Sequence, residues 1–303
     1  MRTIIYVAIF FSFFAICTNT YGQGNLSNNS VENDSLRNLM EIAEQGDPDA
    51  QFNLGVHYFN EMDYNKAAEW FEKAALQGDF TAQFNLGLCF LKGQGRQKNL
   101  DKAYYWINKA AEQGMAEAQY NMGVHCEEYQ DYIGAVNWYM KAAEQGLAPA
   151  QSNLGGCYSE GRGVTRDYFK AAFWYEKAAI QGEMIAQYNY GTCFFEGQGV
   201  PQDYKKALFW FRKAAEQGEV SAQYNVGYCY AFAKGTSRDY GQAFFWFSKA
   251  AKQGEINAQY NLGVCYENGY GVKKDLKQAI YWYKMSARQG HVEAKKQLKR
   301  LQH

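Results

Sequence analysis

Apolar and polar positions along this chain form a pattern that returns seven times, at intervals of 32 or 36 residues. Each copy has an alanine three residues before a tryptophan, and a small-residue pair such as Ala214-Ala215 follows the tryptophan by four and five residues. This spacing puts the three positions on one face of a helix. A fixed period of this length indicates a protein built from stacked repeats. The seven tryptophans of the chain all occupy this one position: Trp70, Trp106, Trp138, Trp174, Trp210, Trp246 and Trp282.

The residues around the tryptophan helix, named helix B, indicate where it begins and ends. Asp or Asn stands seven residues before every tryptophan, as at Asp203. Its side-chain oxygen can accept a hydrogen bond from the free N–H groups of the first turn. The glycine of a closing Gln-Gly pair, as at Gln217-Gly218, suits the left-handed position that ends a helix. Helix B is therefore expected to end at this pair.

A second helix, named helix A, begins each copy at Ala-Gln-x-Asn and carries a glycine in its middle. Such a glycine costs about 1 kcal/mol relative to alanine, so a recurring one needs a reason. We expect close approach of the backbone of helix B to be that reason. The mid-helix glycines are Gly55, Gly87, Gly123, Gly155, Gly191, Gly227 and Gly263.

The connection between helices A and B has two lengths. Five copies insert a loop, such as the Gly-x-Gly segment at residues 196–200, whereas two copies turn sharply near Glu61-Met62 and Tyr129-Gln130. A Gly-x-Gly segment that follows a helix and no strand indicates a turn and not a phosphate-binding loop.

These elements predict an all-α solenoid of helical hairpins. The expected repeats cover residues 50–81, 82–117, 118–149, 150–185, 186–221, 222–257 and 258–290. Lone helices at 35–49 and 291–303 are expected to cap the open ends, because the terminal units of a solenoid need a polar outer side.

The first residues differ in kind from the repeats. Arg2 is the only charge among residues 1–22, and Ile4 to Ile16 are almost wholly apolar. This is typical of a secretory signal peptide and too short for a comfortable membrane span. We expect cleavage after Gly22, a flexible spacer at 23–34, no membrane span in the mature chain, and a periplasmic or extracellular location. Lipid attachment through Cys17 is the less favoured alternative.

The charges balance, with 31 basic and 31 acidic residues. No net field draws the chain to nucleic acid or to an anionic membrane. The one basic cluster evident in the sequence lies at residues 295–300, where it is interpreted as the solvated surface of the last helix.

Several motifs together resemble the Sel-one-like repeat, a relative of the tetratricopeptide repeat. They include Tyr-Asn-Leu-Gly at 260–263, Asp-Tyr-Lys-Lys-Ala at 203–207, and the Gly-x-Gly-Val loop, and the resemblance covers residues 35–302. The resemblance implies a right-handed α/α superhelix that serves as an adaptor or scaffold. Bacterial members with signal peptides are typically periplasmic, exported or host-facing. It names no partner and no cofactor, and we expect no cofactor.

The cysteines and histidines form no expected pairs. Five cysteines are equivalent and Cys126 is offset by one position; like positions in adjacent repeats lie roughly 10 Å apart, whereas a disulfide needs Cα atoms within about 7 Å. Some exported relatives join helix A to helix B with two cysteines per repeat, but helix B has none here. We therefore expect no disulfide, and buried free thiols. His57 and His125 lie two repeats apart, so no metal site is expected.

Alignment with the tetratricopeptide fold through the shared glycine gives candidate partner-binding residues on the concave face of the A helices. They lie three residues before the glycine, one after it and four after it: Phe52, Phe59, Phe84, Tyr120, Tyr188, Phe195, Tyr224, Tyr228 and Tyr260. Aromatic side chains combine a large contact area with, in Tyr, a polar group. The alternative is that these rings only pack between helices. Repeat four is bare at Ser152, Gly156 and Ser159, which suggests two sub-sites.

An asparagine two residues before each glycine forms a second series, interpreted as fixing the geometry between repeats by hydrogen bonds.

Three functions fit these residues. The favoured one is a monomeric, non-enzymatic scaffold that binds a protein or peptide. A β-lactamase-like or penicillin-binding activity, as associated with some cysteine-rich exported relatives, is the second, although Ser-x-x-Lys, Lys-Thr-Gly and Ser-Asp-Asn are absent. The third is a periplasmic regulator of a sensor or an export assembly.

Overall fold

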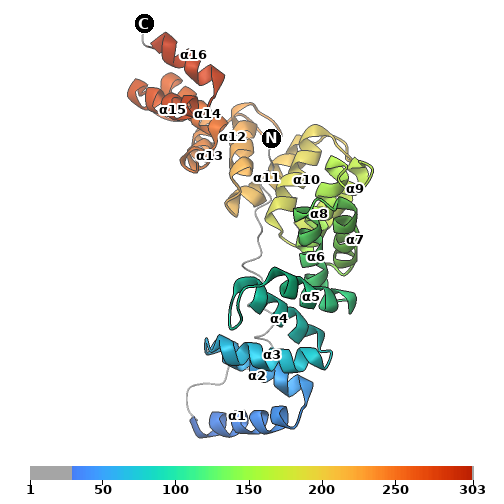
Figure 1. Cartoon of the computed structure of the whole chain (residues 1–303). Coiled ribbons are helices and arrows are strands. Elements are labelled where there is room, and N and C mark those ends of the chain that lie inside the picture. The colour runs from blue at the N-terminus through green and yellow to red at the C-terminus, as the bar shows by residue number, and fades with distance from the viewer. Residues whose placement is uncertain (1–28, 302–303) are drawn as a thin grey trace. The chain divides into compact units, whose positions relative to one another are not determined.

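A computed structural model describes residues 29–301 of the chain. The expected signal peptide at 1–22, Cys17 and spacer residues 23–28 lie outside the described residues. Residues 29–301 form sixteen helices and no strand (Figure 1). The helices are α1 (Asn29–Glu44), α2 (Pro48–Asn60), α3 (Tyr64–Leu76), α4 (Phe80–Lys92), α5 (Leu100–Glu112), α6 (Ala116–Glu128), α7 (Tyr132–Glu144), α8 (Ala148–Glu160), α9 (Tyr168–Ile180), α10 (Met184–Glu196), α11 (Tyr204–Glu216), α12 (Val220–Ala231), α13 (Tyr240–Lys252), α14 (Ile256–Asn268), α15 (Leu276–Arg288) and α16 (Val292–Leu301).

The chain divides into two compact units, with the boundary between Met122 and Gly123 inside α6. In each unit an even-numbered A helix packs against the following B helix, as α4 does on α5 and α10 on α11. Within a unit, B helices also pack against the next A helix, as α3 does on α4 and α11 on α12. The prediction of an all-α solenoid is confirmed within the described residues.

The expected helix ends are confirmed. Asp203 accepts hydrogen bonds from the backbone N–H groups of Lys205 and Lys206 at the start of α11, and the equivalent Asp or Asn caps the other B helices. Each Gln-Gly glycine has a positive φ, for example +106° at Gly218. The two short connections turn through Met62 and Gln130, both at φ 62°. These residues hold the left-handed conformation without glycine.

The mid-helix glycines of the A helices face a side chain more often than a backbone. A Cβ on Gly191 would lie 2.7 Å from the ring atom Cδ1 of Phe211, the residue that follows Trp210. A Cβ on Gly55 would lie 2.6 Å from the corresponding atom of Phe71. The expected backbone approach is therefore corrected, because in most copies the ring after the tryptophan occupies the space.

The N-terminal cap begins earlier than the sequence suggests. Helix α1 starts at Asn29, so its first turns lie in the stretch expected to be spacer, and it ends at Glu44. Its Ala43 packs with Ala50, Leu54 and Trp70 of the first hairpin. At the other end, Ala294 of α16 packs with residues of α15. Both caps thus continue the stacking of the repeats.

Candidate functional site

Buried glutamines align successive hairpins and so set the direction of every A helix. Gln187 on α10 donates through Nε2 to the carbonyl oxygen of Ala179 in the preceding hairpin, at 3.2 Å. Its Oε1 accepts from Nε2 of Gln217, at 2.8 Å, and Gln217 also donates to the carbonyl oxygen of Gly182, at 3.0 Å. Because both ends of the amide are satisfied, the link favours one orientation of neighbouring hairpins. The same link joins Gln77 to Gln51, Gln113 to Gln83, Gln181 to Gln151, Gln253 to Gln223 and Gln289 to Gln259.

The Gly-x-Gly loop is a turn, as predicted, and its second glycine also contacts the preceding hairpin. A Cβ on Gly199 would lie 1.9 Å from the carbonyl oxygen of Tyr168, the first residue of α9. No side chain fits at that distance, so the loop can approach only as glycine. The equivalent pairs are Gly95 with Tyr64, Gly163 with Tyr132, Gly235 with Tyr204 and Gly271 with Tyr240.

The candidate aromatic residues of the A helices rest on the ring that follows the tryptophan. The ring centroids of Tyr188 and Phe211 lie 5.8 Å apart, and those of Tyr224 and Phe247 lie 5.9 Å apart. Phe52 and Tyr260 make the same tilted contact in their own hairpins. These four rings are half-buried, so each both packs and keeps part of its surface in solvent.

The other candidates differ in exposure. Phe59, Tyr120, Phe195 and Tyr228 are half-buried, whereas Phe84 is fully buried at 0% exposure. Phe84 therefore has no surface with which to contact a partner, and its assignment as a binding residue is corrected.

The fourth residue after each mid-helix glycine matches the polarity of the buried side chain that follows the tryptophan. Tyr139 donates its hydroxyl to Glu127 Oε2 at 2.9 Å, and Tyr283 donates to Glu267 Oε2 at 2.7 Å. These two carboxylates accept the hydrogen bonds of buried tyrosine hydroxyls, so they already have an interaction partner within the protein.

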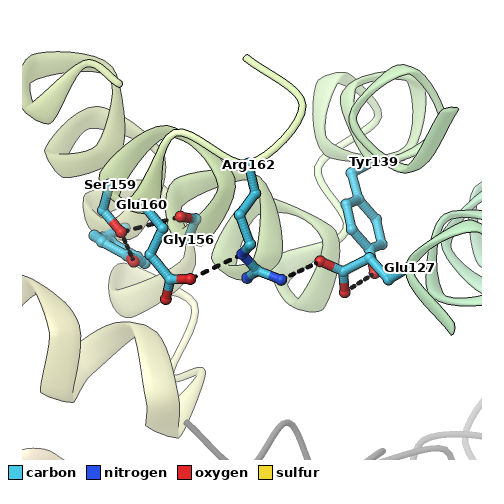
Figure 2. Close-up of polar contacts among 7 residues, drawn as sticks. Glu127, Tyr139, Gly156, Ser159, Glu160 and Arg162 are labelled. Carbon is cyan, nitrogen blue, oxygen red and sulfur yellow. Dashed lines mark hydrogen bonds and ion pairs between the residues drawn. The ribbon is translucent and has the colours of Figure 1, made fainter. Parts of the chain in front are cut away.

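Repeat four, bare in the sequence, is crossed by the side chain of Arg162, which Figure 2 shows between two glutamates. Arg162 Nη1 lies 2.8 Å from Glu127 Oε1, and its Nε lies 2.8 Å from Glu160 Oε2. Ser159 lies 3.0 Å from the carbonyl oxygen of Gly156 and 3.2 Å from the hydroxyl of Tyr175. Repeat four therefore presents a polar surface whose charges pair with one another, and the aromatic surface of this unit begins at repeat five.

Repeats five and six carry the densest group of rings on the A-helix face, named here the aromatic patch: Tyr188, Phe195, Tyr224, Tyr228 and Phe232. Tyr228 lies 6.2 Å from Phe195, 6.3 Å from Tyr224 and 4.5 Å from Phe232, between ring centroids. Phe232 keeps 52% of its surface exposed.

Phe232 was missed by the sequence reasoning, although a signal was present. Other long copies have Gly-x-Gly at this turn, but repeat six has Ala-Lys-Gly, and Ala233 adopts φ 54°. An alanine in the left-handed region costs roughly 1–2 kcal/mol. Strain of this kind, kept beside an exposed ring, is a reason to look for function at that place.

Burial raises the pKa of two tyrosine hydroxyls of the patch, those of Tyr188 and Tyr224. Burial raises the pKa of Tyr224 to about 12, partly opposed by a hydrogen bond from Asn261 in the next hairpin. Burial likewise raises the pKa of Tyr188, with Asn225 as one of its hydrogen-bond partners. These asparagines thus link neighbouring repeats, as expected, while Asn85 and Asn121 instead donate to a carbonyl oxygen in their own helix.

The six described cysteines are free thiols, and all but Cys126 are buried. Burial raises the pKa of Cys89 to about 11 and that of Cys193 to about 12. Among residues 29–301, no three His, Cys, Asp or Glu side chains gather as around a metal ion. Within the same residues, no helix has both the length and the apolar composition needed to cross a bilayer.

A family model described as Sel1 repeat matches the chain at residues 48–79, 81–115, 116–147, 148–183, 185–219, 220–255 and 256–291. None of the curated proteins compared with the chain matches it.

Two solved structures are similar over most of the chain. The first is c5321, described as a protective antigen present in uropathogenic Escherichia coli strains displaying an SLR fold; it has 37% identity and a TM-score of 0.81 over 88% of this chain. The chain spans 59% of the length of c5321. The second is a Sel1 repeat protein from Oxalobacter formigenes, with 35% identity and a TM-score of 0.69, covering 91% of this chain and 82% of that one.

Proposed function

The chain belongs to the Sel1 repeat family, and from this membership we propose that it is a non-catalytic scaffold that binds a protein partner outside the cytoplasm. Sel1 repeat folds are commonly protein-interaction scaffolds. Beyond family membership, we propose a binding site at the aromatic patch, a location outside the cytoplasm and the absence of catalysis.

The aromatic patch is the observation that carries the proposal. Exposed and half-buried rings at the centre of an interface supply most of its binding energy. Tyr188 and Tyr224 already rest on Phe211 and Phe247, so little side-chain freedom is lost when a partner covers them. Their protonated hydroxyls can donate to a partner carbonyl. The patch therefore suits a protein segment that brings apolar side chains and backbone carbonyls together.

Absence of catalysis is proposed from the chemistry of the nucleophiles. Thiolates, and not thiols, attack substrates, and burial raises the pKa of the five buried cysteines and so favours the thiol form. No serine begins a Ser-x-x-Lys motif. A nitrocefin hydrolysis assay on purified protein tests this part, and turnover above the buffer blank would contradict it.

The location outside the cytoplasm is proposed from the apolar stretch at residues 4–16. Cell fractionation with N-terminal sequencing of the product tests it. We expect a mature chain that begins at Gln23. An unprocessed chain in the cytoplasmic fraction would contradict this part of the proposal and leave the binding site untouched.

Site-specific photo-crosslinking tests the patch. A benzoylphenylalanine at position 232 is expected to crosslink a partner in living cells, identified by mass spectrometry. The same residue at position 169 is the matched control, because Phe169 is also exposed, at 77%, but lies on α9. Adding Tyr228→Ala should reduce the crosslink about tenfold, the usual effect of losing a central aromatic contact. Equal products from both positions would count against the patch.

A further inference from the structure

The exposed sides of the last three B helices, α11, α13 and α15, carry a net positive charge, although the charges of the whole chain balance. Helix α11 has four basic residues, α13 has two and α15 has three, against one acidic residue, Glu216. All of these side chains are exposed, and Glu216 pairs with Arg212 at 3.1 Å. The basic residues are Lys205, Lys206, Arg212, Lys213, Lys249, Lys252, Lys277, Lys284 and Arg288. This surface is named here the basic face.

The first four B helices differ, because their basic and acidic residues are nearly equal in number. Helices α3 and α5 each carry two lysines and two acidic residues. The expectation that basic residues gather only in the last helix is therefore incomplete. Spacing within single repeats did not reveal the asymmetry, since it appears only when equivalent helices are compared.

An exposed aromatic ring lies beside the lysines in each helix of the basic face. Phe209, Phe245 and Tyr281 stand immediately before the tryptophans and are about half exposed. Phe209 contacts Trp210 edge-on at 5.1 Å, and Phe245 contacts Trp246 at 5.2 Å, between centroids.

Lysines cover two of these rings. Lys213 Nζ lies 5.2 Å from the centre of the Phe209 ring, and Lys249 Nζ lies 4.8 Å from that of Phe245. A ring and a nearby cation therefore recur at one position in consecutive hairpins.

The stacking of the hairpins brings these positions into line. Gln223 on α12 donates to the carbonyl oxygen of Ala215 in α11, and Gln259 on α14 donates to that of Ala251 in α13, both at 3.3 Å. Each of these hairpins therefore joins the one before it through the same bond, and equivalent residues of α11, α13 and α15 lie along one side of this unit.

We propose that the basic face is a second docking surface, separate from the aromatic patch, that binds an acidic protein segment in which carboxylates alternate with apolar side chains. Complementary charge steers and orients such a segment. The exposed ring edges accept its apolar side chains, and the ammonium groups meet its carboxylates.

The ring geometry favours a polypeptide over other anions. Insertion into a membrane surface needs apolar side chains that project outward, whereas Phe209 and Phe245 lie against a tryptophan with a lysine above them. Stacking of nucleic acid bases needs open ring faces, and lysines cover these. A polypeptide segment that lies along the surface needs neither outward-projecting side chains nor open ring faces.

Charge reversal in matched positions tests the basic face. The test variant is Lys213→Glu with Lys249→Glu. The control variant is Lys109→Glu with Lys177→Glu, which changes the net charge equally and removes the same contact of a lysine with the ring before the tryptophan. The probe is a labelled synthetic peptide in which Glu and Phe alternate, and a Gln and Phe peptide is its neutral counterpart. Binding to the full chain is measured by fluorescence anisotropy.

We expect the test variant to weaken binding of the Glu and Phe peptide at least tenfold and the control variant less than about twofold, as for charges outside the binding surface. Phe209→Ser with Phe245→Ser should also weaken it, and Tyr105→Ser, which changes the equivalent exposed ring on α5, should leave it unchanged. Circular dichroism verifies that each variant is folded.

Three results would overturn the proposal. The first is equal weakening by the test and control variants, which would indicate non-specific attraction. The second is no binding of the peptide, or equal binding of its neutral counterpart. The third is binding to phosphatidylglycerol vesicles that the test variant abolishes while the peptide stays unbound, which would assign the surface to a membrane.

Discussion

At the scale of the residue, the side chain after each tryptophan sets the chemistry of its neighbour on the A helix. Where it is tyrosine, as at Tyr139 and Tyr283, the facing position is polar, as at Glu127 and Glu267. Where it is phenylalanine, as at Phe211, the facing position is apolar, and Phe195 lies 6.0 Å away between ring centroids. A buried tyrosine hydroxyl needs a hydrogen-bond partner, whereas a buried phenylalanine ring does not.

This pairing was available in the sequence but needed the structure to be noticed. The two positions lie in different helices, so nothing in the period of either helix connects them. The exposure of the candidate binding residues was likewise not evident from the pattern within one helix. Phe52 and Phe84 are equivalent in the repeat, yet only Phe84 is fully buried, so the position in the repeat does not by itself determine exposure.

Burial of the thiols leads to a prediction about their reactivity. At about pH 8, a thiol of pKa 11 is ionised in only about one molecule in a thousand, and the pKa of Cys89 is raised to about 11 by burial. Cys89, Cys157, Cys193, Cys229 and Cys265 should therefore resist iodoacetamide in the native protein. Half-exposed Cys126 should react first. Mass spectrometry of alkylated peptides measures the order, with protein unfolded in guanidinium chloride as the control. Equal native rates for Cys193 and Cys126 would contradict the burial.

At the scale of the element, helix boundaries followed from local sequence and loop contacts did not. Asp203 and Gly218 mark the ends of α11 through hydrogen bonding and backbone conformation that depend on a few adjacent residues. By contrast, Gly199 is required by the carbonyl oxygen of Tyr168, thirty-one residues earlier. Such a contact exists only once the hairpins have stacked.

Two glycines of one loop separate these effects experimentally. Gly197 and Gly199 have φ of +72° and +71°, but a Cβ on Gly197 would meet only Gln202, no closer than 3.3 Å. Gly197→Ala should cost about 1 kcal/mol, from backbone strain alone. Gly199→Ala should cost about 3 kcal/mol or more, because overpacking is added to the same strain. Urea unfolding of the two variants measures the difference, and similar losses would show that Gly199 does not touch the preceding hairpin.

At the scale of the whole molecule, the stability of a repeat array is a sum of units and of interfaces between neighbours. The sequence predicted the number of repeats and their all-α character because seven copies carry the same pattern. It did not predict the division at Met122 or the basic face, since neither has a signature within a single copy.

The C-terminal end of the array is expected to loosen in acid. Burial raises the pKa of Glu267, but hydrogen bonds from Arg300 and Tyr283 outweigh it and hold the pKa below its usual value of 4.5. A lowered folded-state pKa contributes stability above about pH 4.5, and that contribution is lost as the pH falls through the folded-state value.

Hydrogen exchange of α16 should therefore accelerate in acid beyond its intrinsic pH dependence. Glu267→Gln removes the titrating group and should abolish the extra change. Persistence of the pH effect in that variant would assign it to another carboxyl group.

The contact of each long loop with its predecessor has a consequence for how such chains change in evolution. The loop glycine rests on a backbone carbonyl oxygen, which every amino acid supplies, and not on a particular side chain. A long copy gained or lost by unequal recombination can therefore be seated on any copy that happens to precede it. Copy number can drift while the surface residues of each unit diversify, and new specificities need no redesign of the joint.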